Sequence, residues 1–198
     1  GMPAARSVLG AALGVRAAPR LLRDGKEWGL VDVRMHAPAE HVVGGQRAAF
    51  EIQLHLSATA LGQTSESVIA LLLHASPAAA SPLFFQQIAA AAASGAQQGG
   101  AAAGGGGGEH PLALHQLLEL AADPSVFYRY SGSFTTPPCA EGVEWLVGEV
   151  RGAALAPADL AVLAWVAGRS VRPVQALDAR TVETLVPFNK VPLDPSFN

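Results

Sequence analysis

From Phe50 to His55 the sequence alternates strictly between apolar and polar side chains, and this run constrains the fold more than any other. Successive side chains of a β-strand point to opposite faces, so the alternation predicts a strand with one apolar and one polar face. The apolar face carries Phe50, Ile52 and Leu54, and the polar face carries Glu51, Gln53 and His55. We expect this strand to extend over residues 48–56 and to pair with neighbours in a sheet.

Other segments indicate that strands outnumber helices along the chain. Further strands are predicted at Trp28 to Met35, Val68 to Leu73, Phe127 to Tyr130 and Val143 to Val150, with a turn at Gly44-Gly45. Short helices are predicted at Leu83 to Ala93, His110 to Ala122 and Pro157 to Val166. Mostly strands with a few short helices predict a β-rich α+β domain.

Composition narrows the function classes. The chain has 198 residues, enough for one domain with a sizeable core. Its formal net charge is -3 and it lacks a basic stripe, which argues against nucleic acid as a partner. The longest apolar runs, such as Val68 to Leu73, have the length of a strand, so we expect no membrane span.

Two segments differ from the rest in composition. Residues 1–24 are rich in arginine and alanine, which suits an organelle transit peptide, a weak secretory signal or an ordinary start of the fold. The sequence therefore does not indicate in which cellular compartment the protein acts. Residues 94–108 (SGAQQGGAAAGGGGG) are of low complexity, and we expect them to be a flexible surface insertion in a domain spanning residues 25–198.

Four motifs in order resemble the α-carbonic anhydrase family over roughly residues 25–185. Residues 34–41 (RMHAPAEH) are similar to the family's H-x-H-A-P-S-E-H, and residues 50–55 (FEIQLH) to its M-E-x-H-L-V. Residues 130–139 (YSGSFTTPPC), with Trp145 after them, match Y-x-G-S-L-T-T-P-P-C, and residues 172–175 (RPVQ) match R-P-x-Q. The resemblance implies a large central, mainly antiparallel twisted sheet with short surrounding helices.

The same resemblance implies a degraded zinc site. The family hydrates carbon dioxide on Zn²⁺ held by three histidines. The corresponding positions here are Arg34, His36 and Gln53, so one ligand of three remains. Arginine is cationic and offers no lone pair, and a glutamine oxygen is a poor zinc ligand. We therefore expect no cofactor, and zinc only if the site is rebuilt.

The residues around the metal positions are better retained. Glu40 and Thr135 match the family's catalytic pair, in which the carboxylate orients the threonine hydroxyl. Glu51 matches the carboxylate that steadies the third histidine, and His41 a structural histidine. Val68, Phe134 and Thr136 match pocket positions.

His55 stands where the family usually has valine, beside the metal. Either His36 and His55 share a metal, or His55 is a polar residue that fills an emptied site. The remaining histidines, His74, His110 and His115, match no ligand position. Because an unpaired buried charge is costly, we expect Arg34 to be tied to an acceptor and to compensate the carboxylates Glu51 and Glu40.

The family's amino-terminal Q-S-P-I segment has no counterpart here, which suggests a fragment or a shortened variant. Some family members pair an early cysteine with the position of Cys139, the sole cysteine of this chain. The leading hypothesis is a carbonic-anhydrase-like domain without hydratase activity that acts by binding or assembly with an unspecified protein partner. Non-catalytic relatives with arginine and glutamine at these ligand positions are a precedent within the family. The alternatives are an active enzyme with a rebuilt metal site and a gene product whose fold is not maintained.

Overall fold

The computed structural model describes residues 20–23, 25–97, 113, 115–168 and 171–185. These residues form a curled seven-stranded sheet in the order β1–β2–β5–β6–β8–β7–β9 and a separate hairpin, β3–β4. The pair β6–β8 is parallel and every other pair is antiparallel, which confirms the mainly antiparallel sheet expected from the sequence. The strands are β1 (Arg20–Arg23), β2 (Lys26–His36), β3 (Val42–Val43), β4 (Gln46–Arg47), β5 (Phe50–Ala60), β6 (Gln63–Leu73), β7 (Phe127–Ser133), β8 (Glu141–Glu149) and β9 (Glu183–Leu185).

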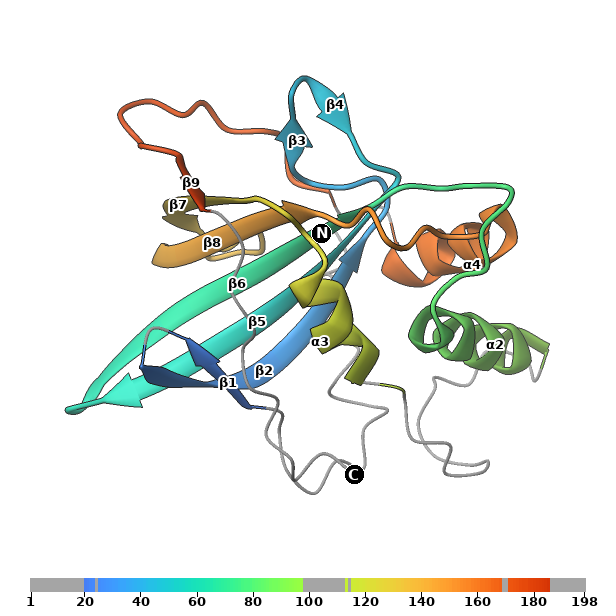
Figure 1. Ribbon diagram of the computed structural model, residues 1–198, viewed down its shortest axis with the longest axis horizontal. Coiled ribbons are helices and arrows are strands. Elements are labelled where there is room, and N and C mark those ends of the chain that lie inside the picture. Colours follow the sequence, from blue (N-terminus) through green and yellow to red (C-terminus); the bar gives the residue numbers. More distant parts are fainter. Residues whose placement is uncertain (1–19, 24, 98–112, 114, 169–170, 186–198) are drawn as a thin grey trace.

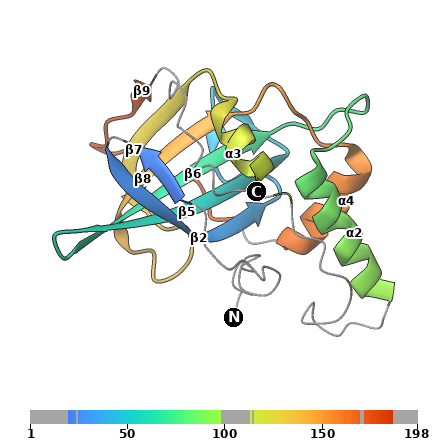
Figure 2. The same ribbon diagram turned by 60° about the horizontal axis from the view of Figure 1, so that its bottom comes forward.

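Three helices lie against one face of this sheet in the described part of the chain: α2 (Leu83–Gln97), α3 (His115–Ala122) and α4 (Pro157–Ala167). Figures 1 and 2 both place α2 and α4 side by side at one end of the sheet, with α3 in front of the central strands. Proline begins α4, as expected, because its missing N–H has no partner at a helix start. Helix α2 continues to Gln97, so the first four residues of the low-complexity segment are helical. Residues 98–108 of that segment and His110 lie outside the described residues.

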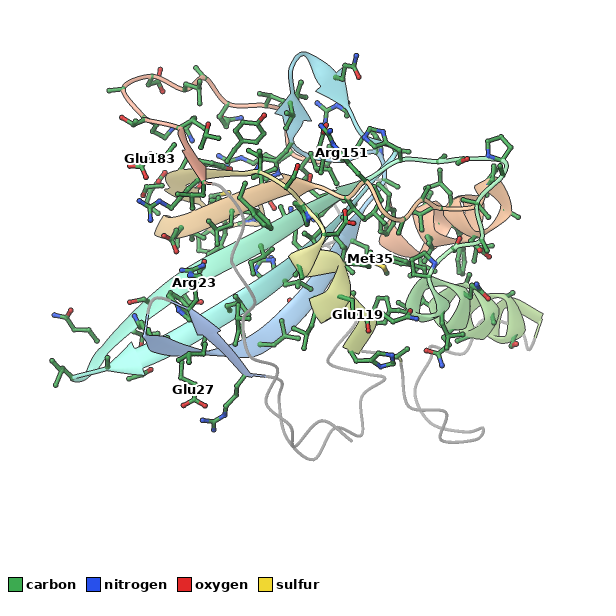
Figure 3. All side chains as sticks on the ribbon, in the orientation of Figure 1. Arg23, Glu27, Met35, Glu119, Arg151 and Glu183 are labelled. Carbon is green, nitrogen blue, oxygen red and sulfur yellow. The ribbon has the colours of Figure 1, made fainter. Side chains whose placement is uncertain are left out.

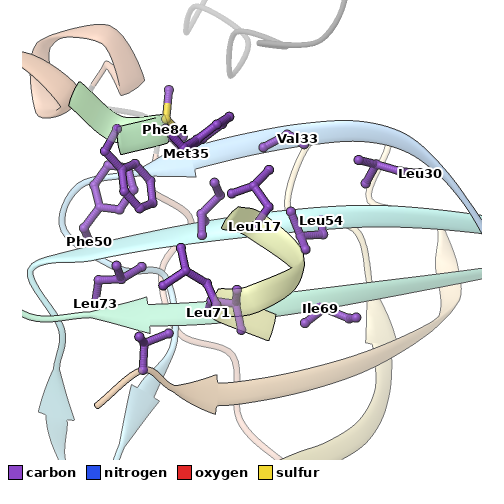
Figure 4. Packing of buried hydrophobic residues seen from close by; sticks show 14 of the residues in the cluster. Leu30, Val33, Met35, Phe50, Leu54, Ile69, Leu71, Leu73, Phe84 and Leu117 are labelled. Atoms are coloured by element: carbon purple, nitrogen blue, oxygen red, sulfur yellow. The ribbon is translucent and has the colours of Figure 1, made fainter. Parts of the chain in front are cut away.

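The main core fills the space between the sheet and the helices (Figure 4). Phe50 on β5 packs edge-on against Phe85 on α2, with ring centroids 5.6 Å apart. Each such side chain contributes about 1.5–3 kcal/mol when fully buried. The sheet supplies Trp28, Leu30, Val33, Met35, Phe50, Ile52, Leu54, Leu56, Ala58, Ile69, Leu71, Leu73, Phe127 and Leu146 to this core.

A β-bulge in β2 decides which of its side chains face the core. The pairing with β5 shifts between Leu30 and Asp32. The extra residue reverses the alternation, so Leu30 and Val33 both point to the helices. Beyond the bulge, Arg34 and His36 therefore point to the opposite face, where the retained motifs converge.

The opposite face of the sheet carries a smaller apolar cluster, made by Ala39, Ala48, Val68, Ala70, Leu72, Val143, Trp145 and Val147. The hairpin β3–β4 lies above this face in Figure 1. Its turn is Gly44-Gly45, with φ of 57° and 76°, the left-handed values that a tight hairpin turn requires and that glycine adopts without strain.

The edge strand β1 is anchored across the sheet. Arg23 is 5% exposed; it donates to Ser67 Oγ at 3.0 Å and forms an ion pair with Glu144 on β8. Its guanidinium also stacks over Trp28 at 4.5 Å from the ring centroid (Arg23 is labelled in Figure 3). Residues 20–23, within the segment considered for targeting, thus belong to the sheet, while residues 1–19 lie outside the described residues.

No helix among the described residues is long and apolar enough to cross a membrane.

Candidate functional site

Strand pairing brings together Arg34, His36 and Gln53, the three residues that the sequence motifs match to the family's zinc ligands. In the antiparallel register of β2 and β5, Arg34 lies opposite Gln53, and His36 lies opposite Glu51. Gln53 and Glu51 are fully buried and His36 is 1% exposed. The alternation that places Glu51 and Gln53 on one face of β5 was predicted from the sequence.

Arg34 is held by two neighbours on its own side of the sheet. Its Nε donates to Asp32 Oδ2 at 2.9 Å, and its Nη1 donates to Thr136 Oγ1 at 2.7 Å. The expectation that Arg34 compensates Glu40 and Glu51 is therefore wrong. Asp32 precedes Arg34 by two residues on β2, so the two side chains reach one another without crossing the strand gap.

Gln53 compensates these carboxylates instead. Its Nε2 donates to Glu40 Oε2 at 3.0 Å and to Glu51 Oε1 at 2.8 Å. Since both neighbours are carboxylate oxygens, the amide must turn its nitrogen toward them. Its oxygen then faces His55 Nε2 at 3.3 Å. Gln53 thus serves as a hydrogen-bond donor between two acids.

Glu51 is the most heavily hydrogen-bonded acid of the site. Its Oε2 accepts the backbone N–H groups of Glu40 and His41, each at 2.9 Å, and its Oε1 accepts from His41 Nδ1 at 2.8 Å as well as from Gln53. Burial alone would raise its pKa, but the charge and hydrogen bonds of His41 and the bond from Gln53 outweigh it and lower the pKa to about 2. Glu51 is therefore ionised at neutral pH.

His41 bridges Glu51 to Tyr130. Its Nε2 lies 2.7 Å from the Tyr130 hydroxyl, and its ring centroid is 5.0 Å from that of Trp145. Burial raises the pKa of Tyr130 well above its ordinary value, so the phenol stays protonated. Both ring nitrogens of His41 are occupied, which suits a structural role.

Glu40 and Thr135 are not hydrogen-bonded to each other. Glu40 Oε1 accepts the backbone N–H of Arg172 at 2.8 Å, and its Oε2 accepts from Gln53. Thr135 Oγ1 is buried without a hydrogen-bond partner in the described part of the structure. Glu40 therefore does not orient Thr135 as expected, because its carboxylate accepts hydrogen bonds from Gln53 and Arg172 instead.

A pocket of about 250 Å³ opens beside Arg34. Two of the three expected pocket residues, Phe134 and Thr136, line it together with His55. Val68 is fully buried in the apolar cluster of the same face and is not among the lining side chains. The complete lining is Val31, Asp32, Arg34, His55, Glu66, Phe134, Thr136, Pro137 and Pro138.

His55 is 3% exposed and stacks on Phe134, with ring centroids 5.6 Å apart. Burial, and next the positive charge of Arg34, lower its pKa to about 4 despite the opposing effect of Asp32. His55 is therefore neutral at pH 7. Its ring fills space between Gln53 and Phe134.

Replacing His55 with valine is expected to flatten the pH dependence of stability. Between about pH 6.5 and 4 an unfolded chain protonates this histidine and the native state does not, so the free energy of unfolding falls as pH falls. The loss amounts to as much as about 3 kcal/mol. Urea titrations at pH 7 and pH 4 should show that His55→Val loses less stability than the parent, while the exposed-site control His74→Val behaves like the parent. Equal losses in all three proteins would contradict the result.

Among the described residues no group of three or more histidine, cysteine, aspartate or glutamate side chains is arranged to hold a metal ion. Of the residues that the motifs match to zinc ligands, Arg34 presents a guanidinium bonded to Asp32, and Gln53 turns its amide nitrogen to carboxylates. His36 Nε2 lies 3.5 Å from Glu40 Oε2. His74 and His115 are exposed and outside the site.

Sequence reasoning missed Asp32, Arg172 and Glu66 as parts of the site. Asp32 and Arg34 could have been paired from their i, i+2 spacing on one strand. Arg172 belongs to a recognised motif, but its side chain donates to Ser133 Oγ at 2.9 Å and its backbone to Glu40, which no spacing reveals. Glu66 offered no signal of its own.

The fold and the site together define a carbonic-anhydrase-type domain: a curled mixed sheet with His36, Glu40 and Glu51 gathered on one face. The chain belongs to the eukaryotic-type carbonic anhydrase family, whose model matches residues 26–186.

Individual relatives agree with this family. Carbonic anhydrase Nec1 of Nesocodon mauritianus is 28% identical over 171 residues, covering 84% of this chain and 58% of Nec1. Dioscorin DB3S of Dioscorea polystachya is 26% identical over 154 residues, covering 76% of this chain and 52% of the dioscorin. The chain thus spans little more than half the length of these relatives.

Solved structures share the fold. The α-carbonic anhydrase of Photobacterium profundum aligns with a TM-score of 0.64 at 25% identity, covering 84% of this chain and 69% of that one. A dioscorin complexed with ascorbate aligns with a TM-score of 0.62 at 23% identity, covering 86% of this chain and 67% of that one.

Proposed function

We propose that this α-carbonic anhydrase domain does not hydrate carbon dioxide and acts by binding. The observation that carries the proposal is the position of Arg34. Its permanent positive charge stands at the residue that the sequence motif matches to the first zinc ligand, and it is fixed by Asp32 at 2.9 Å and Thr136 at 2.7 Å. A cation held there by two partners opposes Zn²⁺ by charge repulsion and supplies no lone pair.

Hydration needs a nucleophile that these residues do not supply. In active carbonic anhydrases, the standard example of this effect, the bound zinc lowers the pKa of its water from about 15.7 to about 7 and so supplies hydroxide at neutral pH. Here Glu51 is held by four hydrogen bonds, and Glu40 is occupied by Gln53 and Arg172. Neither carboxylate is placed to activate a water in place of the metal.

Zinc content and hydration rate test the proposal directly. We expect protein purified from zinc-supplemented medium to carry well below about one zinc per chain by elemental analysis, and to leave the stopped-flow rate of carbon dioxide hydration at the buffer value. The alternative, an active enzyme with a metal site rebuilt around His36 and His55, predicts about one tightly held zinc and a sulfonamide-sensitive rate. That result would overturn the proposal.

A further inference from the structure

The pocket beside Arg34 suits a small organic molecule. Its volume of about 250 Å³ lies just below the range of roughly 300–1,000 Å³ typical of drug-sized ligands, so its occupant must be smaller than those. Apolar walls come from Val31, Phe134, Pro137 and Pro138. The polar groups come from β2, β5 and β6 and from Thr136.

Arg34 retains hydrogen-bonding capacity toward this pocket. Asp32 and Thr136 take one donor each from Nε and Nη1. Nη2 donates to no residue that the structure describes, and the side chain is 22% exposed. A guanidinium edge with free N–H groups matches the two oxygens of a planar carboxylate.

The pocket also carries two carboxylates. Asp32 Oδ2 accepts from Arg34 and its Oδ1 accepts the backbone N–H of Val33 at 2.9 Å. Glu66 lies on β6, the strand next to β5, and forms no hydrogen bond or ion pair with any described residue. Glu66 is close to His55 along the sheet, since His55 pairs with Val68 and Ser57 pairs with Glu66. A simple anion would be attracted by Arg34 but repelled by the two carboxylates. A simple cation would be attracted by the two carboxylates but repelled by Arg34.

We propose that this pocket binds a small zwitterion of the α-amino acid type with an apolar side chain. Its carboxylate pairs with Arg34, its ammonium with Asp32 and Glu66, and its side chain packs on Phe134 and the two prolines. Each charge of the ligand then meets the opposite charge in a partly desolvated pocket. The inference rests on the proposed function, because it requires Arg34 rather than a metal at this position.

Three probes of nearly identical shape test the charge pattern. L-leucine carries both charges, 4-methylpentanoate lacks the ammonium, and 3-methylbutylamine lacks the carboxylate. Isothermal titration of the full chain should show leucine binding at least about tenfold more tightly than either single-charge analogue, which corresponds to about 1.4 kcal/mol. Equal affinity of leucine and 4-methylpentanoate, or no binding of leucine at millimolar concentration, overturns the inference.

Variants locate the site. Glu66→Gln should weaken leucine binding about tenfold and leave 4-methylpentanoate no weaker, whereas the exposed control Glu119→Gln should change neither. Arg34→Gln should abolish binding of leucine, with circular dichroism confirming its fold. An unchanged leucine affinity in Glu66→Gln contradicts the placement. Zinc measured on the same preparation separates the two proposals. If the protein is zinc-free and does not bind leucine, only the proposed ligand is wrong. If the protein carries zinc, the proposed function is wrong.

Discussion

Exchanging both Arg34 and Gln53 for histidine is expected to give a chain that holds about one zinc, whereas we expect the parent to hold well below one. The backbone brings the three positions together, since Arg34 and Gln53 are paired across β2 and β5 and His36 follows on the same face. Glu51 Oε1, released from the Gln53 amide, would be free to accept from the new imidazole. Elemental analysis checks the stoichiometry.

A second readout guards against adventitious metal. At a zinc concentration of about 100 times the dissociation constant, binding stabilises a folded protein by about 2.7 kcal/mol, or roughly 5–10 °C in Tm for a chain of this size. We expect this zinc-dependent shift in the double variant and in neither single variant, since each of those keeps two ligands at most. If the double variant folds but stays metal-free, the correspondence of these positions with the family ligands is wrong. His55 would then be the first residue to exchange for valine.

Replacing Gln53 with methionine is expected to destabilise the fold by about 3 kcal/mol, or some 6–12 °C in Tm. Methionine preserves the length of the side chain but removes the N–H groups given to Glu40 and Glu51. Both acids are buried, and removing a donor from a buried carboxylate costs more than the bond itself contributes.

The matched control is Gln63→Met, the same exchange at an exposed position at the start of β6. Its free energy of unfolding should stay within about 0.5 kcal/mol of the parent. Thermal and urea unfolding of the three proteins provide the comparison. An equal effect at both positions would mean that the amide of Gln53 does not stabilise the two carboxylates.

The sequence predicted the strands of the site but not how its charged groups pair. Alternation placed Glu51, Gln53 and His55 on one face of a strand, because strand geometry depends on local pattern. The motifs matched Arg34, His36 and Gln53 to the family's ligand positions. The partner of Arg34 was a choice among several carboxylates within reach. Side-chain reach and competing donors decide such choices, and both depend on tertiary contacts that no local pattern encodes.

The bulge in β2 illustrates the second limit. A regular strand would place Leu30, Asp32 and Arg34 on one face, yet Leu30 faces the core and Arg34 the site. The inserted residue leaves no compositional mark, since Val31 is an ordinary strand residue. Glu66 was missed for a related reason. It lines the pocket only because β6 pairs with β5, and a local pattern does not reveal which strands are neighbours.

The parallel pairing of β6 with β8 affects the rate at which this protein folds. The two strands can meet only after the chain between Leu73 and Glu141 has closed, and the contact between Arg34 and Thr136 spans 102 residues. Such non-local contacts make folding slow, since the entropy of closing a long loop is lost before the contact forms. That entropy grows only as the logarithm of length, about 0.6 kcal/mol for each doubling. The glycine- and alanine-rich stretch inside this connection therefore adds little to the thermodynamic cost of bringing β6 and β8 together.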